Sequence, residues 1–429
     1  MEQSTLMLII LAVATVMFLC RKIPIFFTCI VAMLATYFSG VLTVNEAFNG
    51  FSSSAVWSLV GMSMATGAFK ASGLADLVGI KLFSLTGGNQ KYVSIGVYLI
   101  AAALTFITPG MTVVLLLMPM VDALVSQSNG TLSRKMTYMP LGIGALLGGN
   151  LTLSGSANLL QTSGMLEGVT GETFSYFTPF PIAIATVVFG LVYLLTFGPK
   201  IMKKVFKPEE EAALAVDAAA VNAFQERGAK VTNKMKITAV ILLAMLALLI
   251  WNKWSMPVVA FSAVSLLVVT GCVKPDEAVS NVPWTLTLQI IAMLGLAKGI
   301  SVSGAGDVLG NLVLGAGTKL GLGAFGILVM YMLMCQILSN FLSSKVACVG
   351  ILVPIALSMA QALGTNALAY ALATVIAVNA SFLTPICCPL IAFTWSAGYK
   401  FTDYFRANIL LNVFTFVGSV IAVKLVYFM

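Results

Sequence analysis

The stretch Gly148-Gly149-Asn150-Leu151-Thr152-Leu153-Ser154-Gly155-Ser156-Ala157-Asn158 lies inside residues 138–166, an apolar segment long enough to cross a membrane. Most residues of the stretch are glycine, serine, threonine or asparagine, so a continuous span is not expected here. In hydrocarbon every backbone N–H and C=O group needs a partner, and a broken helix persists only where protein or a water-filled cavity surrounds it. This stretch therefore predicts a broken helix at a polar site inside a membrane protein.

The composition of the whole chain also indicates a membrane protein. Of the 429 residues, 59% are hydrophobic and 9% are charged, whereas a soluble domain has roughly 25% charged residues. The net charge of +8 follows the positive-inside rule, so we expect no nucleic-acid partner. The chain has no histidine, and its apolar part offers no paired carboxylates, metal-ligand cluster or nucleophile–base pair. We therefore expect no enzyme activity.

The apolar segments predict an all-α polytopic membrane protein. We expect spans at residues 5–20, 24–42, 55–73, 138–166, 178–198, 237–251, 255–273, 284–302, 367–396 and 405–427. Two further apolar segments, 91–124 and 319–360, are interrupted by polar residues, glycine or proline. The polar stretch 200–236 carries eight basic residues, which predicts an interfacial helix on the cytoplasmic side.

The second half of the chain repeats the first. Val44-Asn45-Glu46-Ala47 has a counterpart in Val273-Lys274-Pro275-Asp276-Glu277-Ala278, Leu117-Met118-Pro119-Met120 in Leu352-Val353-Pro354-Ile355, and Gly171-Glu172-Thr173-Phe174-Ser175-Tyr176-Phe177 in Gly398-Tyr399-Lys400-Phe401-Thr402-Asp403-Tyr404-Phe405. Each half holds five spans and one interrupted segment, an odd number of crossings. Two halves joined by one cytoplasmic loop then lie in opposite orientations, as in the inverted repeats of secondary transporters.

This pattern predicts two inverted repeats joined by a linker. The first repeat, residues 1–199, has scaffold helices at 5–73, a hairpin at 91–124 and a broken helix at 138–166. The linker is 200–236, and the second repeat, 237–429, has its hairpin at 319–360 and its broken helix at 367–396. We expect both termini outside and, because no targeting peptide is recognisable, a multi-pass location in a prokaryotic inner membrane.

Three more breaks accompany the first one. Thr105-Phe106-Ile107-Thr108-Pro109-Gly110-Met111-Thr112 and Ser339-Asn340-Phe341-Leu342-Ser343-Ser344-Lys345 interrupt the two hairpin segments, and Asn379-Ala380-Ser381-Phe382-Leu383-Thr384-Pro385-Ile386-Cys387-Cys388-Pro389 interrupts the span 367–396. A Pro-Gly pair inside an apolar segment predicts a reversal of the chain, and hence a re-entrant hairpin with a polar tip. Glycine, serine and threonine also let helices pack closely, but four breaks in matched pairs favour a binding site.

Broken helices present half-helix N-termini to anions and free carbonyl groups to cations. Together with hydroxyl and amide side chains, these ends can hold an anion and a small hard cation such as sodium. The candidate anion-binding residues are Thr108, Gly110, Thr112, Ser154, Ser156, Asn158, Ser343, Ser344, Lys345, Thr384 and Pro385. The candidate sodium ligands are Thr105, Thr108, Gly149, Asn150, Ser339 and Asn379.

The breaks resemble motifs of the divalent anion:sodium symporter family, within the wider ion transporter superfamily. The stretch Gly148–Asn158 is similar to a Gly-Gly-x-x-Thr-Leu-x-Gly-x-x-x-Asn pattern apart from one position of spacing. Asn49-Gly50-Phe51-Ser52 and Ser381-Phe382-Leu383-Thr384-Pro385 extend the resemblance over both halves. The resemblance implies a homodimeric elevator carrier for di- or tricarboxylates or sulfate. Each protomer would have a scaffold and a moving transport domain that holds the hairpins and broken helices.

The hairpin tips depart from the family pattern. Where the family has Ser-Asn-Thr, this chain has Thr108-Pro109-Gly110 and Ser343-Ser344-Lys345, so that both asparagines are missing. A lysine at the membrane centre costs about 2.5–3.5 kcal/mol on insertion scales. We therefore expect the Lys345 ammonium to replace a bound cation or to pair with an anionic substrate; the alternative is that it extends to the membrane interface.

The leading functional hypothesis is secondary active transport of a small anion, coupled to sodium or not. A sodium-independent anion exchanger that uses Lys345 in place of a cation is one alternative. A cation/proton antiporter of the same superfamily is another, although proton coupling typically uses intramembrane carboxylates or histidines. We expect no cofactor other than sodium, and the lipid bilayer, a small anion and a second copy of the chain as partners.

Overall fold

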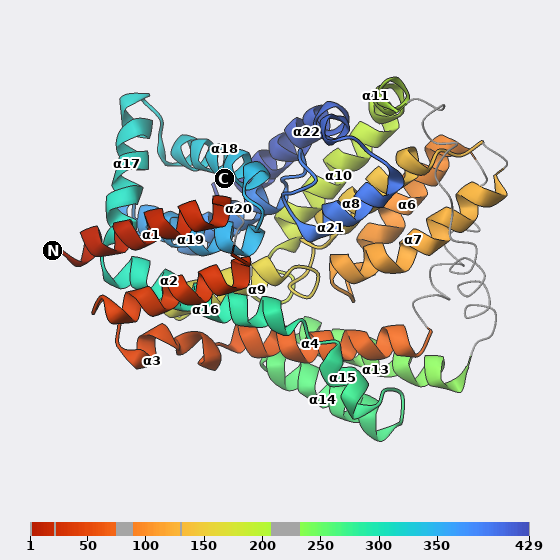
Figure 1. Ribbon diagram of the computed structural model, residues 1–429, viewed down its shortest axis with the longest axis horizontal. Helices are drawn as coiled ribbons and strands as arrows, with labels where there is room; N and C mark the ends of the chain where they lie inside the picture. Colours follow the sequence, from red (N-terminus) through yellow and green to blue (C-terminus); the bar gives the residue numbers. More distant parts are fainter. Residues whose placement is uncertain (1, 21–22, 74–88, 129–130, 207–231, 429) are drawn as a thin grey trace.

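The computed structural model describes residues 2–20, 23–73, 89–128, 131–206 and 232–428 (Figure 1). Every regular element in these ranges is a helix. The first half contains α1 (Gln3–Cys20), α2 (Ile25–Phe38), α3 (Val44–Ala47), η1 (Asn49–Ser52), α4 (Ser54–Ala71), α6 (Gln90–Leu104), α7 (Gly110–Gln127), α8 (Arg134–Gly148), α9 (Ala157–Thr170), α10 (Phe180–Thr196) and α11 (Gly198–Val205). The second half contains α13 (Asn233–Trp251), α14 (Met256–Val269), α15 (Pro275–Ser280), α16 (Trp284–Val302), α17 (Ala305–Lys319), α18 (Ala324–Phe341), α19 (Lys345–Ala362), α20 (Ala367–Asn379), α21 (Pro389–Thr394), η3 (Trp395–Ala397) and α22 (Phe401–Tyr427).

Local sequence signals explain many of the helix ends. The side chains of Thr232 and Asn366 cap α13 and α20 by accepting backbone N–H groups of the first turn, which satisfies donors that a helix start leaves free. Gly171 ends α9 and Gly398 ends η3 with φ of 78° and 83°, a conformation that glycine adopts without steric cost. These two glycines belong to the repeated motifs, so the two copies of the motif end a helical element in the same way.

The helices follow the expected spans closely. Five of the described helices are long and apolar enough to cross a membrane by themselves, and α10 and α11 form a further candidate pair with a bend of 64°. Other apolar helices, including α2 and α14, have 10–17 residues. The helix α17 was not expected, because its four glycines weaken the apolar pattern that would predict it. Of the linker 200–236, residues 207–231 lie outside the described part.

Helix contacts in the two halves occur in matching pairs. The helix α2 packs on α16, and its counterpart α14 packs on α4. The short helix α3 also contacts α16, as α15 contacts α4. In the same way, α6 and α7 pack on α8, while α18 and α19 pack on α20 (Figure 1). Each half therefore completes its packing through equivalent elements, some within the half and some in the other half.

Close approach of backbones is achieved at a few glycines. A Cβ atom on Gly144 of α8 would lie 2.3 Å from the Tyr98 carbonyl oxygen of α6, and one on Gly295 of α16 would lie 2.2 Å from the Ala47 carbonyl oxygen. Because these neighbours are backbone atoms, neither position accepts a side chain without displacing a helix. Small residues at helix contacts let helices approach closely where lipid offers no hydrophobic driving force.

We expect Gly144→Ala to lower the stability of the protein by about 1–3 kcal/mol, the usual cost of overpacking a well-filled interior. The measurement is the thermal unfolding midpoint in detergent. The matched control is Gly315→Ala on α17, where nothing lies within 4 Å of the added Cβ and where alanine favours the helix. Equal midpoints for both variants would contradict the close packing of α8 on α6.

Candidate functional site

The first helix break lies between α8 and α9 and is hydrogen-bonded to the first hairpin tip. The helix α8 ends at Gly148 and α9 begins at Ala157, so residues 149–156 are unwound. The tip between α6 and α7 is held by two hydrogen bonds to this segment and by a third from Tyr176, which lies between α9 and α10. The Gly110 N–H donates to the Gly155 carbonyl at 3.4 Å, and the Phe106 carbonyl accepts from the hydroxyls of Ser154 at 3.1 Å and Tyr176 at 2.7 Å. These bonds give the unwound backbone partners inside the protein.

The second break is bonded to the second hairpin in the same manner. The helix α20 ends at Asn379 and α21 begins at Pro389. The Asn340 side chain, at the end of α18, accepts the Leu383 N–H at 2.8 Å. The backbone carbonyl of Asn340 accepts a hydrogen bond from the Thr384 hydroxyl at 2.6 Å, and the Ser339 hydroxyl donates to the Val378 backbone carbonyl at 3.2 Å. Each hairpin tip thus packs on the broken helix of its own half.

The two breaks meet through asparagine side chains. The side-chain amide of Asn379 donates to the side-chain oxygen of Asn150 at 2.7 Å and to the Ser156 hydroxyl at 3.1 Å. The Asn158 amide donates to the Asn379 side-chain oxygen at 2.6 Å. Asn150 and Asn379 are each 1% exposed, and the Asn150 amide nitrogen has no hydrogen-bond partner. A buried donor without a partner is costly, so this amide is available to an acceptor that the site binds.

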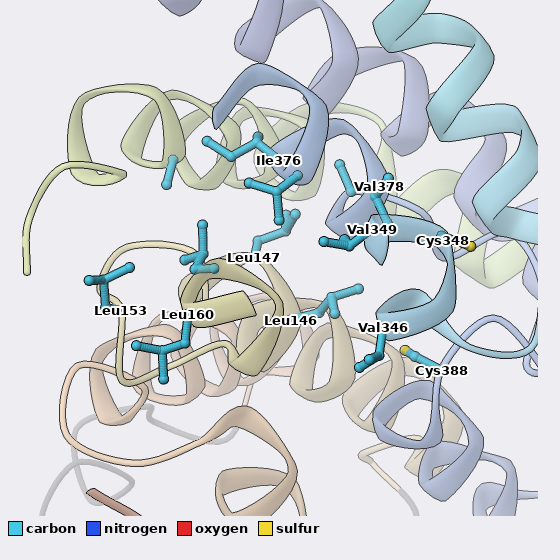
Figure 2. Close-up of a cluster of buried hydrophobic side chains, with 14 of the residues drawn as sticks. Leu146, Leu147, Leu153, Leu160, Val346, Cys348, Val349, Ile376, Val378 and Cys388 are labelled. Atoms are coloured by element: carbon cyan, nitrogen blue, oxygen red, sulfur yellow. The ribbon is translucent and has the colours of Figure 1, made fainter. Parts of the chain in front are cut away.

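A cluster of buried apolar side chains combines residues of the segments that form both breaks (Figure 2). Leu146 and Leu147 come from the end of α8, Val346 from the start of α19, and Ile376 and Val378 from the end of α20. All five side chains are buried. An apolar surrounding lowers the local dielectric response, which strengthens the hydrogen bonds inside it and raises the cost of an unpaired polar group. The asparagine bonds are therefore important in fixing how the two breaks meet.

Lys345 is the first residue of α19 and points at the second break. Its ammonium donates to the carbonyl oxygens of Asn379 at 2.7 Å and Ser381 at 2.9 Å. The residue is 5% exposed. The interpretation that this side chain extends to the membrane interface is therefore wrong, because the backbone carbonyls at the end of α20 hold its ammonium inside the protein.

A cleft of about 910 Å³ reaches the first break. Its inner part is formed by Ser154, by Pro109 and Thr112 at the start of α7, and by Ala157 at the start of α9. The cleft also contacts Leu59, Ser63, Thr66, Gly67, Ala71, Ser72, Gly73, Met111, Leu115, Leu116, Pro119, Thr232, Met235, Glu277, Ser280, Asn281, Pro283 and Leu286. Thr232 is exposed whereas Ser154 is buried, and the cleft extends from the start of α13 to the break.

A second, much smaller crevice of about 40 Å³ lies at η1, α9, α16 and α19. Its lining includes Ser53, Gly164, Lys298 and Pro354. A Cβ on Gly164 would lie 2.9 Å from the Ser53 hydroxyl oxygen. The Ser54 hydroxyl donates to the Glu167 carboxylate at 3.0 Å. The start of α4 and the end of α9 are thus in contact next to this crevice.

The structure places the predicted site residues at the cleft, at the asparagine centre, at the second break, or in contacts away from all three. Thr112 and Ser154 line the cleft, and Gly110 lies between two residues that do. Ser156, Asn158, Asn150 and Asn379 form the asparagine centre, while Ser344, Lys345 and Thr384 are buried and hydrogen-bonded at the second break. The hydroxyls of Thr105 and Thr108 donate to backbone carbonyls of α6, and Gly149 packs on Gly155. The Ser339 hydroxyl bonds the end of α20, and Pro385 is buried. The Ser343 hydroxyl has no hydrogen-bond partner.

Several polar residues at the breaks were not singled out from the sequence. Gln336 and Asn412 both donate to the Ala380 carbonyl, at 3.0 and 2.8 Å. Gln289 of α16 donates to the Ser344 hydroxyl at 2.9 Å. Their common signal is an amide side chain in an otherwise apolar helix, which is costly in a membrane unless it has a partner.

One carboxylate of α7 is buried inside the protein. Asp122, in the C-terminal part of this helix, is 8% exposed. It forms a two-pronged ion pair with Arg134, with distances of 2.7 and 2.9 Å. The pair fastens the end of α7 to the start of α8. In the described part of the chain, no group of three metal-ligating side chains occurs.

Sequence comparison relates the chain to transporters. The family model described as "Citrate transporter" matches residues 7–345. The chain is 25% identical over 198 residues to the uncharacterized transporter sll0640 of Synechocystis, and 30% identical over 188 residues to the uncharacterized transporter YfbS of Escherichia coli. These alignments cover 46% and 43% of this chain but only 32% and 30% of the two relatives. An uncharacterized transporter of Haemophilus influenzae is 23% identical, over 95% of this chain and 88% of the relative.

Two solved transporter structures share the fold. The YdaH transporter of Alcanivorax borkumensis matches with a TM-score of 0.62 and 12% identity, over 89% of this chain and 87% of that chain. MtrF of Neisseria gonorrhoeae, described among antimetabolite efflux pumps, matches with a TM-score of 0.57 and 11% identity, over 100% of this chain and 96% of that chain. At these identities the likeness concerns the fold alone.

We expect Asn150→Ala and Asn379→Ala each to destabilise the protein, because each leaves buried amide groups without partners at about 1–3 kcal/mol. The double variant should lose clearly less than the sum of the two, since the residues share a hydrogen bond. Denaturant unfolding in detergent measures all three. Asn311→Ala, at an exposed position of α17, is the control and should unfold like the parent. Strict additivity would show that the asparagines do not act together.

Proposed function

Because the chain belongs to the citrate transporter family, we propose that it is a secondary active transporter of a small anion, either a di- or tricarboxylate or a sulfate-like oxyanion. The family and the apolar helices make the chain a multi-pass membrane transporter and not an enzyme. The substrate, the coupling ion and the mechanism are parts of the proposal.

The observation that carries the proposal is that two helix N-termini face one cleft. Pro109, Met111 and Thr112 at the start of α7 line the cleft, and so does Ala157 at the start of α9. Neither helix has an acidic residue in its first turn. Each helix N-terminus carries about half a positive charge together with unpaired N–H groups, and such ends bind carboxylates, sulfates and phosphates.

The charge distribution favours an anion over a cation as substrate. Among the described residues that line the cleft, Glu277 is the only charged one, and it is exposed at the wide end. In the part of the chain that the structure describes, the inner end has hydroxyl groups and helix N-termini but no carboxylate to bind a metal cation or a proton. This argues against the cation/proton antiporter, for which an intramembrane carboxylate or histidine is the usual requirement.

The two cavities support an alternating-access mechanism with inverted repeats. The cleft is lined by α4, α7 with Pro119, and α15, whereas the crevice is lined by α16, α19 with Pro354, and η1. Of these, α4 corresponds to α16 and α7 to α19, but the two cavities measure about 910 and 40 Å³. We propose that the transport domain moves past the scaffold as an elevator, closing the cleft and opening the crevice.

The orientation and the partners follow from the same proposal. The cleft opens near Thr232, beside the basic stretch 200–236, so under the positive-inside rule it opens to the cytoplasm and both termini lie outside. Oxygen atoms of Thr105, Thr108, Gly149 and Asn150 at the first break remain the candidates for a sodium ion. A homodimer held by scaffold helices, in a prokaryotic inner membrane, completes the proposal.

Uptake of radiolabelled citrate, succinate and sulfate into proteoliposomes, with and without a sodium gradient, tests the proposed function. We expect saturable uptake of at least one of these anions. Exchange of sodium or potassium for protons without anion uptake would instead support the antiporter.

We expect Thr112→Val to raise the KM for the transported anion about 10- to 150-fold, because the loss of one hydrogen bond to a charged group costs about 1.5–3 kcal/mol. The substitution keeps the shape of the side chain and removes only its hydroxyl. The control is Thr66→Val, on the wall of the same cleft, whose hydroxyl bonds the Met62 carbonyl of its own helix. Equal KM values for the two variants would place the substrate away from the start of α7.

Cross-linking tests the opening of the small crevice. The variant with Ser54→Cys and Glu167→Cys places thiols at two residues whose side chains share a hydrogen bond of 3.0 Å. Because cysteine is shorter than glutamate, a short bifunctional methanethiosulfonate reagent is used to join the two thiols. We expect cross-linking to lower uptake at least 10-fold and reduction to restore it, because α9 must separate from α4 in each cycle. Each single-cysteine variant, treated with the same reagent, serves as the control. Full activity of the cross-linked protein would refute the proposed movement at this contact.

A further inference from the structure

Lys345 carries a buried positive charge without an acidic partner. Its ammonium is bonded to the Asn379 and Ser381 carbonyl oxygens, and among the residues that the structure describes no carboxylate lies within ion-pair distance of it. Taking an ammonium group out of water costs several kcal/mol even after relaxation. Neutral carbonyls lower this cost but leave the charge in place, so the charge itself requires an explanation.

The acceptors of this ammonium are the kind of oxygen atoms that bind hard cations. They lie at the C-terminal end of the half-helix α20, which carries the negative end of the helix dipole. Unwound carbonyls and half-helix C-termini are the usual ligands of small cations in transporters with broken helices. In this chain, an ammonium fixed to α19 occupies that environment.

The other carbonyls of the same break are bonded to neutral side chains. Gln336 and Asn412 donate to the Ala380 carbonyl, and the Ser339 hydroxyl donates to the Val378 carbonyl. The charged donor is thus used only at the Asn379 and Ser381 carbonyls, and Asn379 is also the residue whose side chain bonds the first break.

The repeat shows that this cation is a feature of one half only. Pro354 in α19 corresponds to Pro119 in α7, and at the same spacing Lys345 corresponds to Gly110. Gly110 has no side chain and gives only its backbone N–H to the first break, at 3.4 Å from the Gly155 carbonyl oxygen. Among the residues with described positions, the second break therefore carries a cation of its own and the first does not.

We propose that the Lys345 ammonium is a built-in cation at the second break, which takes the place of a free coupling cation there and supplies the positive charge that a bound anion neutralises. Only the second claim, that a bound anion neutralises this charge, rests on the proposed anion transport. The second half of the site then functions without a bound sodium ion, and any sodium dependence of transport arises at the first break.

Thermal unfolding in detergent tests the inference without relying on transport. Lys345→Ala empties the space next to the two carbonyls, and we expect its unfolding midpoint to fall in choline chloride and to recover partly in sodium chloride at equal ionic strength. A ligand that binds only the folded state stabilises it in proportion to the logarithm of its concentration. Lys345→Met fills the same space with a neutral side chain and should lose stability without recovery in sodium. The control Lys319→Ala, exposed at the end of α17, should unfold like the parent in both salts.

Two outcomes would overturn the inference. The first is an identical response of Lys345→Ala and the parent protein to sodium. The second is measured on the parent protein alone, so it applies even if the variants fail to fold: sodium activation of uptake with a Hill coefficient near two requires a second bound ion and leaves no role for a built-in one. If the parent transports no anion, the proposed function fails, while the unfolding comparison still decides whether Lys345 stands in for a cation.

Discussion

The need to give every backbone polar group a partner away from water governs this structure. Two helices are unwound in the interior, at residues 149–156 and 380–388, and each would be very unstable in lipid. The hairpin tips and buried amide side chains supply the missing donors and acceptors. As a consequence, the polar groups that stabilise the breaks and those available to a solute occupy the same small region, and a change in either affects the other.

The unwound backbone groups of the two halves are hydrogen-bonded by different types of side chain. The first break uses hydroxyl groups, with Ser154 and Tyr176 bonded to the Phe106 carbonyl, and it ends in an open cleft. The second break uses amides and the Lys345 ammonium, which is buried. Since the Asn150–Asn379 hydrogen bond joins the breaks, a charge fixed on one side lies close to a site that is accessible from the other. The two breaks together thus form one asymmetric site.

The packing around the site combines fixed and separable contacts. The Asp122–Arg134 ion pair and the close approach at Gly144 fasten α7, α8 and α6 to one another. By contrast, α9 meets the start of α4 through the small residue Gly164 and the Ser54–Glu167 hydrogen bond. A contact made by one hydrogen bond and small side chains costs much less to separate than a buried ion pair whose removal leaves a charge unpaired. In the proposed elevator mechanism, the fastened helices α6, α7 and α8 move together, and the contact between α9 and α4 is the one that separates.

The sequence by itself determined the all-helical membrane class, the spans, the four interruptions and the transporter family, because apolar run length and helix-breaking residues are local signals. It also identified Lys345 as unusual, since a lysine in an apolar segment is costly wherever it points. Only the tertiary structure decided that Lys345 bonds α20, that Asn379 meets Asn150, and that Thr112 and Ser154 face a cleft while Ser344 does not. Those facts depend on distances between segments more than 200 positions apart in the case of the asparagines, and no local pattern encodes such distances. The helix α17 was missed because its glycines weaken the local helical pattern. Its packing on α19, a tertiary contact, explains why the segment nevertheless forms a helix.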